Sequence, residues 1–230
     1  MSSIDSNLQE VKGRVATACL AAGRDAKGVT LLAVSKTRGV DAVREAAAAG
    51  QRAFGENYVQ EGLGKIAALA DLGLEWHLIG AMQGNKTRVV AEAFDWVHSV
   101  DRLKIAQRLA DQRPAHRPPL QLCLQVNVSG EASKSGVAPQ ELPALAAAVA
   151  ALPADRVRLR GLMAIPAPAD GMQAQREPHR RLREMAEALA AQGLHLDTLS
   201  MGMSEDLEAA IAEGSTLVRV GTAIFGARGT

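Results

Sequence analysis

One pattern in the sequence constrains the fold more than any other. A short apolar run bounded by Gly, Pro or Asp, followed by an alanine-rich segment with helical spacing, recurs eight times. This alternation is typical of βαβ units wound around a parallel sheet. We expect strands at residues 30–35, 52–55, 76–80, 96–100, 120–127, 157–165, 198–201 and 217–221, and helices at 40–49, 58–72, 86–93, 103–112, 139–151, 174–191 and 205–213. Eight equivalent strands within 230 residues favour a closed (β/α)8 TIM barrel over an open doubly wound sheet.

The chain is expected to form a single domain over residues 1–230. Its proline-rich stretches, 113–119 and 166–171, are short enough to be loops, so nothing in the composition marks a linker. An extra helix at 4–22 precedes the first strand and carries an apolar stripe at spacings of three and four residues. We expect residues 1–24 to pack on the barrel through this helix.

Charge and composition exclude several classes of protein. The chain has 26 basic and 25 acidic side chains, so it lacks the basic field that neutralises nucleic-acid phosphates. The N-terminus has neither the basic start nor the apolar core of a secretory signal, and no apolar run approaches 18 residues. Two cysteines far apart in apolar runs indicate no disulfide framework, and five histidines show no metal-ligand spacing. We expect a cytoplasmic protein without metal, nucleic-acid or membrane partners.

Ligands of such barrels bind at the C-terminal ends of the strands, and polar residues follow several strands here. Lys36 comes directly after the first strand, and the alternation of side chains along the strands points both Lys36 and Arg219 into the barrel. The loops after the last two strands, 200–204 and 221–223, contain Gly, Ser and Thr. Backbone N–H groups in such loops, helped by the hydroxyls of Ser204 and Thr222, can hold a phosphate.

Each of these residues also has a purely structural interpretation. Lys36 is either a rim lysine in a salt bridge with a neighbour such as Glu56, or a partly desolvated amine that forms a Schiff base with an aldehyde. Ser204 is either a helix N-cap or a phosphate ligand, and Gly221 either a simple turn or part of a phosphate loop. The basic segment at 176–183 includes acidic neighbours, so we interpret it as a solvated helix face.

At these residues the sequence resembles the pyridoxal phosphate homeostasis protein family, whose barrel is similar to the N-terminal domain of alanine racemase. The segments that carry the resemblance are 33–37 (AVSKT), 54–58 (FGENY), 76–80 (WHLIG), 85–86 (NK), 133–136 (SKSG), 160–163 (RGLM), 199–206 (LSMGMSED) and 219–226 (RVGTAIFG). One departure lies at 81–86, where Gly84 stands in place of an expected hydroxyl residue.

The resemblance implies pyridoxal 5′-phosphate (PLP) as the cofactor. Lys36 is then the lysine that forms the aldimine, Arg219 approaches the pyridine nitrogen, and Ser204, Gly221 and Thr222 line the phosphate site. We assign to the same cofactor site Asn57, His77, Met163, Ser200 and Met203.

The residues argue against strong catalysis. Arg219 has no acceptor atom and can only donate to an unprotonated ring nitrogen, which weakens the electron sink. The only tyrosine, Tyr58, is better suited to packing than to acid–base chemistry. We therefore expect a protein that stores, buffers or delivers PLP and so affects amino-acid and keto-acid balance.

Two alternative functions are also compatible with the sequence, and the partners and oligomeric state are expectations. The alternatives are a PLP-dependent racemase acting on small amino acids and a Schiff-base aldolase that uses no cofactor. The expected partners are PLP and recipient apoenzymes, and the expected state is a monomer. Lys134, in the loop at 129–136, is expected to approach bound cofactor or a recipient.

Overall fold

The computed structural model describes residues 3–131 and 135–226, and its eight parallel strands close into a barrel in chain order. The strands are β1 (Thr30–Val34), β2 (Ala53–Glu56), β3 (Glu75–Leu78), β4 (Trp96–Val100), β5 (Leu120–Gln125), β6 (Val157–Met163), β7 (Thr198–Ser200) and β8 (Leu217–Val220). Strand β1 pairs with β2 on one side and with β8 on the other, which closes the ring. The (β/α)8 barrel expected from the sequence is confirmed.

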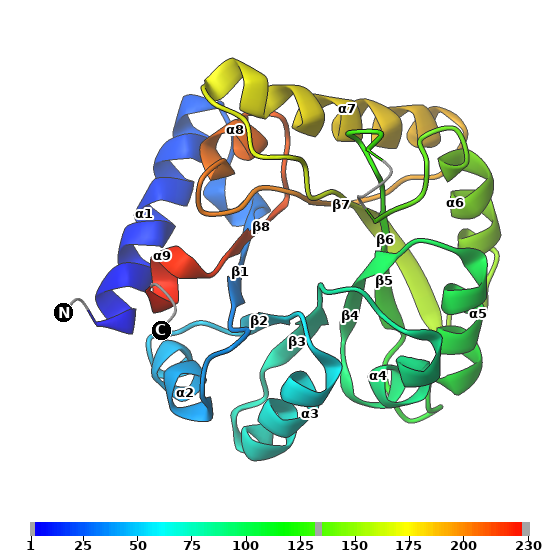
Figure 1. Ribbon diagram of the computed structural model, residues 1–230, viewed down its shortest axis with the longest axis horizontal. Coiled ribbons are helices and arrows are strands. Elements are labelled where there is room, and N and C mark those ends of the chain that lie inside the picture. Colours follow the sequence, from blue (N-terminus) through cyan, green and yellow to red (C-terminus); the bar gives the residue numbers. More distant parts are fainter. Residues whose placement is uncertain (1–2, 132–134, 227–230) are drawn as a thin grey trace.

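Helices surround the strands on the outside (Figure 1). They are α1 (Ile4–Ala21), α2 (Val40–Ala48), α3 (Val59–Ala68), α4 (Thr87–Ala93), α5 (Leu103–Gln112), α6 (Leu142–Ala150), α7 (Met172–Ala191), α8 (Leu207–Ala212) and α9 (Thr222–Phe225). Within the described ranges, no helix is long and apolar enough to cross a membrane.

Alternation along each strand divides the apolar residues between two layers. On β5, Leu122 and Leu124 belong to the large core shared with the helices, whereas Cys123 lies in a separate interior cluster with Trp96 and Met163. A second interior cluster, which contains Leu32, Val34, Ala53, Ile79 and Leu217, fills the barrel between β1, β2, β3 and β8. Every second side chain of a strand points into the barrel, and where such a side chain is polar the strand places it in the barrel interior.

Helix α1, at the start of the described chain, contacts the helices at its end. Ser3 caps it by accepting the N–H of Ser6, and its buried stripe faces the core through Leu8, Val11, Val15, Ala18 and Cys19. Its polar side chains reach the last two helices: Arg14 binds Glu208 on α8, and Asn7 donates to the carbonyl of Ile224 on α9. Helix α1 therefore supports the two helices that follow the loops expected to hold phosphate.

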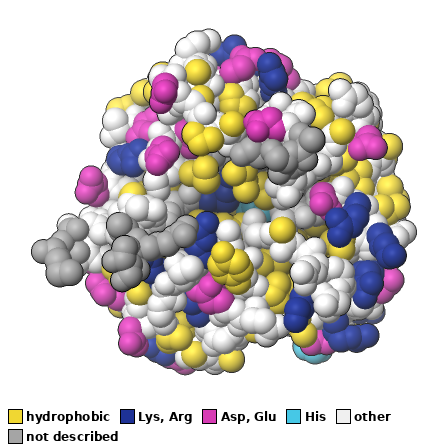
Figure 2. Space-filling view, in the orientation of Figure 1, with side chains coloured by type: hydrophobic (Ala, Val, Ile, Leu, Met, Phe, Trp, Pro, Cys, Tyr) yellow, Lys and Arg dark blue, Asp and Glu magenta, His cyan; other side chains and the backbone are white. Residues whose placement is uncertain are grey.

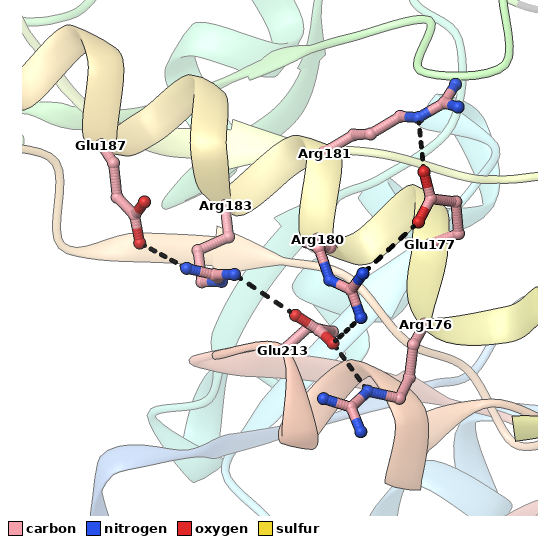
Figure 3. Close-up of polar contacts among 7 residues, drawn as sticks. All are labelled: Arg176, Glu177, Arg180, Arg181, Arg183, Glu187 and Glu213. Carbon is pink, nitrogen blue, oxygen red and sulfur yellow. Dashed lines mark hydrogen bonds and ion pairs between the residues drawn. The ribbon is translucent and has the colours of Figure 1, made fainter. Parts of the chain in front are cut away.

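Helix α7 is fixed to the end of α8 by one buried carboxylate. Glu213 is only 3% exposed and accepts from Arg176 at 2.6 Å, from Arg180 at 3.2 Å and from Arg183 at 3.5 Å (Figure 3). The interpretation of this basic segment as a solvated face is therefore incomplete, because three of its arginines converge on a neighbouring helix.

Candidate functional site

A cavity of about 470 Å³ lies at the C-terminal end of the barrel, a size common for small-molecule sites. It is lined by Val34, Lys36, Thr37, Arg38, Asn57, Ile79, Ile165, Pro166, Ala167, Pro168, Ala169, Asp170, Gln175, Pro178, Met203, Ser204, Glu205, Asp206, Arg219, Gly221 and Thr222. Figure 2 shows basic side chains in a central hollow with hydrophobic side chains around it. The cavity thus combines an apolar rim with charged side chains of both signs, three basic (Lys36, Arg38 and Arg219) and three acidic (Asp170, Glu205 and Asp206).

Lys36 enters this cavity from a strained turn at the end of β1. The next residue, Thr37, has a φ of 62°, a left-handed conformation that is uncommon for a threonine. Its N–H donates to Oε1 of Glu61 at 2.6 Å, and Glu61 in turn binds Lys65 four residues along α3. Strain of this kind persists only where surrounding contacts hold it, so Glu61 fixes the turn that presents Lys36.

A buried polar cluster lies directly behind this turn. Lys65 Nζ donates to Oε1 of Glu56 at 2.7 Å and to the carbonyl of Ser35 at 2.6 Å, and the Ser35 hydroxyl donates to the same carboxylate oxygen. Burial raises the pKa of Glu56 above its ordinary value, against the opposing effects of its hydrogen bonds with Lys65 and Ser35. Glu56, considered from the sequence as a salt-bridge partner of Lys36, is therefore the partner of Lys65.

Arg219 lines the same cavity from β8, the strand that pairs with β1, and is only 4% exposed. Its Nη1 donates to the carbonyl and the hydroxyl of Ser200, at 2.6 and 2.8 Å, and its Nη2 donates to the carbonyl of Ala164 at 2.9 Å. Burial lowers the pKa of Arg219 to about 10, which leaves the guanidinium charged near neutral pH. A guanidinium has five N–H donors, so two remain for a ligand.

The conformation of the loop after β7 depends on Gly202 and on the contact between His179 and Asp206. Gly202 has a φ of 94°, and a Cβ there would lie 2.5 Å from Cβ of Ala210, so only glycine fits. Asp206 accepts the N–H of Met203 at 2.6 Å and binds the buried His179 at 2.9 Å. Burial raises the pKa of Asp206, but the hydrogen bonds with His179 and Met203 outweigh it, so the net shift is downward.

The loop after β8 approaches β1 closely. A Cβ on Gly221 would lie 3.1 Å from the carbonyl oxygen of Val34, so this position favours glycine. Gly221 precedes α9, whose first residue is Thr222, and the first N–H groups of a helix have no partner within it. The N–H of Thr222, together with its hydroxyl, can therefore donate to a ligand in the cavity.

The structure separates the expected site residues into two groups. Those that line the cavity are Lys36, Asn57, Met203, Ser204, Arg219, Gly221 and Thr222. His77, Met163 and Ser200 are buried in the barrel interior beneath it. Lys134 lies outside the described residues, so its expected approach to the cofactor stays a prediction.

Sequence reasoning missed the residues that hold the cavity in shape. His98 could have been found, because it lies two residues after Trp96 on an apolar strand and so points to the same side, into the barrel. Glu61, His179 and Asp206 could not, because their contacts join elements that only the folded barrel brings together. In the described part of the chain, no group of three or more His, Cys, Asp or Glu could hold a metal ion.

Comparisons with known proteins are consistent with this geometry. A family model described as the N-terminal domain of alanine racemase matches residues 3–229. A pyridoxal phosphate homeostasis protein of Pseudomonas aeruginosa is 65% identical over 228 residues, covering 99% of this chain and 97% of that protein. PipY of Synechococcus elongatus PCC7942, solved with PLP bound, is 40% identical with a TM-score of 0.80, covering 92% of this chain and 100% of PipY.

Alanine racemases share the fold at much lower identity. The enzyme of Corynebacterium glutamicum is 17% identical with a TM-score of 0.68, and the match covers 97% of this chain but 62% of the racemase. The likeness therefore shows the fold of the barrel, and the match leaves part of the racemase uncovered.

Proposed function

Because this chain belongs to the family of pyridoxal phosphate homeostasis proteins, we propose that it binds PLP in the cavity at the C-terminal end of the barrel and acts in PLP homeostasis. The observation that carries the proposal is that Lys36, just after the first strand, and Arg219, on the last, line one cavity. An amine and a donor-only cation on one cavity wall suit a small aldehyde with an aromatic nitrogen.

The cavity residues fit the three parts of PLP. Lys36 is the amine for the aldehyde, and Arg219, with two N–H donors to spare, is the donor for the ring nitrogen. Ser204, Gly221 and Thr222 offer hydroxyl and backbone N–H donors for the phosphate. This assignment is our proposal for the cofactor site, together with Asn57 and Met203 on the same wall.

When bound, PLP supplies an aldehyde that reacts reversibly with amines and a conjugated ring that stabilises carbanions. The protein controls how far the second property is used. Arg219 stays protonated near neutral pH and can only donate, so beside the ring nitrogen it would favour the form of that nitrogen that carries no proton and accepts a hydrogen bond. This arrangement favours holding the cofactor over driving carbanion chemistry.

Racemisation needs a second acid or base on the opposite face of the substrate, and the tyrosine of this chain is not placed to serve as one. Tyr58 is the only tyrosine in the chain, is 59% exposed and does not line the cavity. The protein therefore stores, buffers or delivers PLP, with PLP-dependent apoenzymes as recipients. The monomeric state and cytoplasmic location expected from the sequence stay predictions.

Covalent trapping tests the proposal. The purified protein is incubated with PLP and reduced with borohydride, and the modified lysine is identified by peptide mass spectrometry. We expect the label on Lys36 and its loss in Lys36→Ala, whereas Lys104→Ala, which removes an exposed lysine on α5, keeps it. Equal labelling of the wild type and Lys36→Ala would refute the proposal.

A further inference from the structure

An unbroken line of hydrogen bonds crosses the barrel interior beneath the cavity. It starts at Glu75, the first residue of β3, whose Oε1 lies 2.8 Å from Nε2 of His77. Nδ1 of His77 lies 2.9 Å from Nε2 of His98, and Nδ1 of His98 lies 2.8 Å from Oγ of Ser200. Oγ of Ser200 accepts from Arg219 at 2.8 Å. We call these five residues the interior chain.

For two neutral imidazoles, the two ends of the interior chain fix the direction of every bond in it. Arg219 can only donate and an ionised Glu75 can only accept. Since the Ser200 oxygen accepts from Arg219, its single proton is available for Nδ1 of His98. His98 then donates from Nε2 to Nδ1 of His77, and His77 donates from Nε2 to Glu75. Each neutral imidazole is thereby protonated at Nε2.

The surroundings of His98 support its neutral state. Burial lowers the pKa of His98 well below its ordinary value, and the charge of the nearby Arg219 acts in the same direction. The hydrogen bond with His77 holds the pKa of Glu75 below its ordinary value, more strongly than burial raises it. Burial raises the pKa of Cys123 to about 12, so this thiol adds no charge.

The other charged groups near the interior chain lie on its flank. Trp96 stacks on His77 with ring centres 5.3 Å apart, and the Arg160 guanidinium lies 4.9 Å above the Trp96 ring. Arg160 is itself paired with Asp197 at 2.7 Å. Because Arg160 and Asp197 offset each other, this flank has little net electrostatic effect on the imidazoles.

Arg219 depends on the interior chain because its direct partners are all neutral oxygens, those of Ser200 and Ala164. A buried cation is costly unless it is paired. Glu75, with a side chain 49% exposed at the opposite end of the barrel, is the carboxylate that the hydrogen bonds connect to it. Asp206 acts on Arg219 only through space.

We propose that Glu75, His77, His98 and Ser200 are positioning residues for Arg219, so that a carboxylate at the N-terminal end of the barrel sets the orientation of the guanidinium in the cavity at the other end. The effect on the cofactor rests on the proposed function. The state of the imidazoles does not, because it is a property of the protein alone.

The first test therefore uses the wild-type protein without PLP. Nitrogen-15 NMR of labelled histidine side chains distinguishes protonated from unprotonated ring nitrogens. We expect His77 and His98 to be neutral near pH 7 and protonated at Nε2. A proton on Nδ1 of either ring, or a charged imidazole, would overturn the proposal.

The second test measures PLP affinity in variants of Glu75. Glu75→Gln keeps an acceptor oxygen and removes the charge, whereas Glu75→Leu removes both. We expect the dissociation constant to rise about threefold for Gln and about tenfold for Leu, a coupling typical of residues that act through a network. Asp155→Asn, which removes an exposed carboxylate just before β6 at the same end of the barrel, is the matched control and should change nothing.

The remaining outcomes are separable. Equal affinities for the wild type and both Glu75 variants would overturn the proposal. Should Glu75→Leu fail to fold, the comparison of wild type with Glu75→Gln decides. If the wild type itself does not bind PLP, the proposed function fails, and the imidazole measurement still judges the positioning role.

Discussion

Oε1 of Glu61 accepts the backbone N–H of Thr37 at 2.6 Å, one residue beyond Lys36. The bond holds a threonine with a φ of 62°, and Lys65 holds Glu61 in turn. The position of the amine in the cavity therefore depends on a carboxylate from the next helix of the barrel.

Removing that carboxylate should disturb Lys36 more than it disturbs the fold. We expect Glu61→Ala to lower the free energy of unfolding by about 2 kcal/mol, the usual net value of the two hydrogen bonds that Glu61 accepts from Thr37 and Lys65. Borohydride-trapped labelling of Lys36 at limiting PLP should fall by more than the reduced stability of the fold would produce. The control is Glu45→Ala, which removes a similar bond, to the N–H of Ile4, away from the cavity. Equal labelling in both variants would contradict the prediction.

Replacing Lys65 should leave a buried charge without its cation. We expect Lys65→Met to lower the free energy of unfolding by about 3–5 kcal/mol at pH 7, because Glu56 then stays buried and unpaired. The pKa of Glu56 is already raised, so the folded state binds its proton more readily than the unfolded state does. The deficit should therefore shrink as the pH falls towards about 4.5, the unfolded value.

Urea unfolding at pH 7 and pH 5 measures this difference. A deficit that is the same at both pH values would show that Glu56 is not the cause. The double variant Lys65→Met with Glu56→Gln should recover part of the lost stability at pH 7, since it buries no charge.

Asp206 should make the protein sensitive to acid. Its pKa is lowered in the folded state, so the stability it contributes is complete above the unfolded value of about 4 and is lost as the pH falls through the folded value. We expect Asp206→Asn to be less stable near neutral pH and to lose less stability between pH 5 and pH 3. Urea unfolding across this range checks the slope, and parallel curves for the two proteins would exclude Asp206 as its source.

Substitution by alanine should be harmful at Gly80 and stabilising at Gly64, because the space around the two glycines differs. A Cβ on Gly80 would lie 2.1 Å from the carbonyl oxygen of Asn57, so Gly80→Ala must displace the loop after β2 and weaken PLP binding. Gly64 in α3 has open space around the added carbon, so Gly64→Ala should raise the free energy of unfolding by about 1 kcal/mol. Thermal unfolding and PLP titration of both variants test this contrast.

The carboxylate of Glu213 should matter more than any arginine around it. Glu213→Ala leaves three arginines without their shared partner, and we expect a loss of about 3 kcal/mol. Each arginine is about one-third exposed, so single changes such as Arg183→Met should cost about 1 kcal/mol or less. Chemical unfolding of the variants provides the comparison, and equal losses would contradict the central role of Glu213.

The sequence predicted the barrel well because its strongest signal, the alternation of apolar strands with alanine-rich helices, is local. The strand at 96–100 and the helix at 103–112 were predicted to the residue. Helix ends were less accurate: the helix expected at 139–151 begins at Leu142, because Ala138, Pro139 and Glu141 form turns instead.

The site was predicted in part for an equally physical reason. Alternation shows on which side of a strand a residue lies but not how far along the barrel its side chain reaches. Lys36 and Arg219 both point inward and both line the cavity, whereas His77 and Ser200 also point inward but lie below it. Contacts such as that of His179 with Asp206 join separate elements and leave no pattern in the sequence.

The pairing of β1 with β8 has a consequence for folding. Lys36 and Arg219 are 183 positions apart in the sequence, and they face one cavity only when the last strand has closed the ring against the first. A chain truncated before Leu217 retains the lysine but loses Arg219, Gly221 and Thr222. Ligand binding therefore requires a closed barrel. A folding intermediate in which β8 has not yet paired with β1 has no pocket in which to hold an aldehyde.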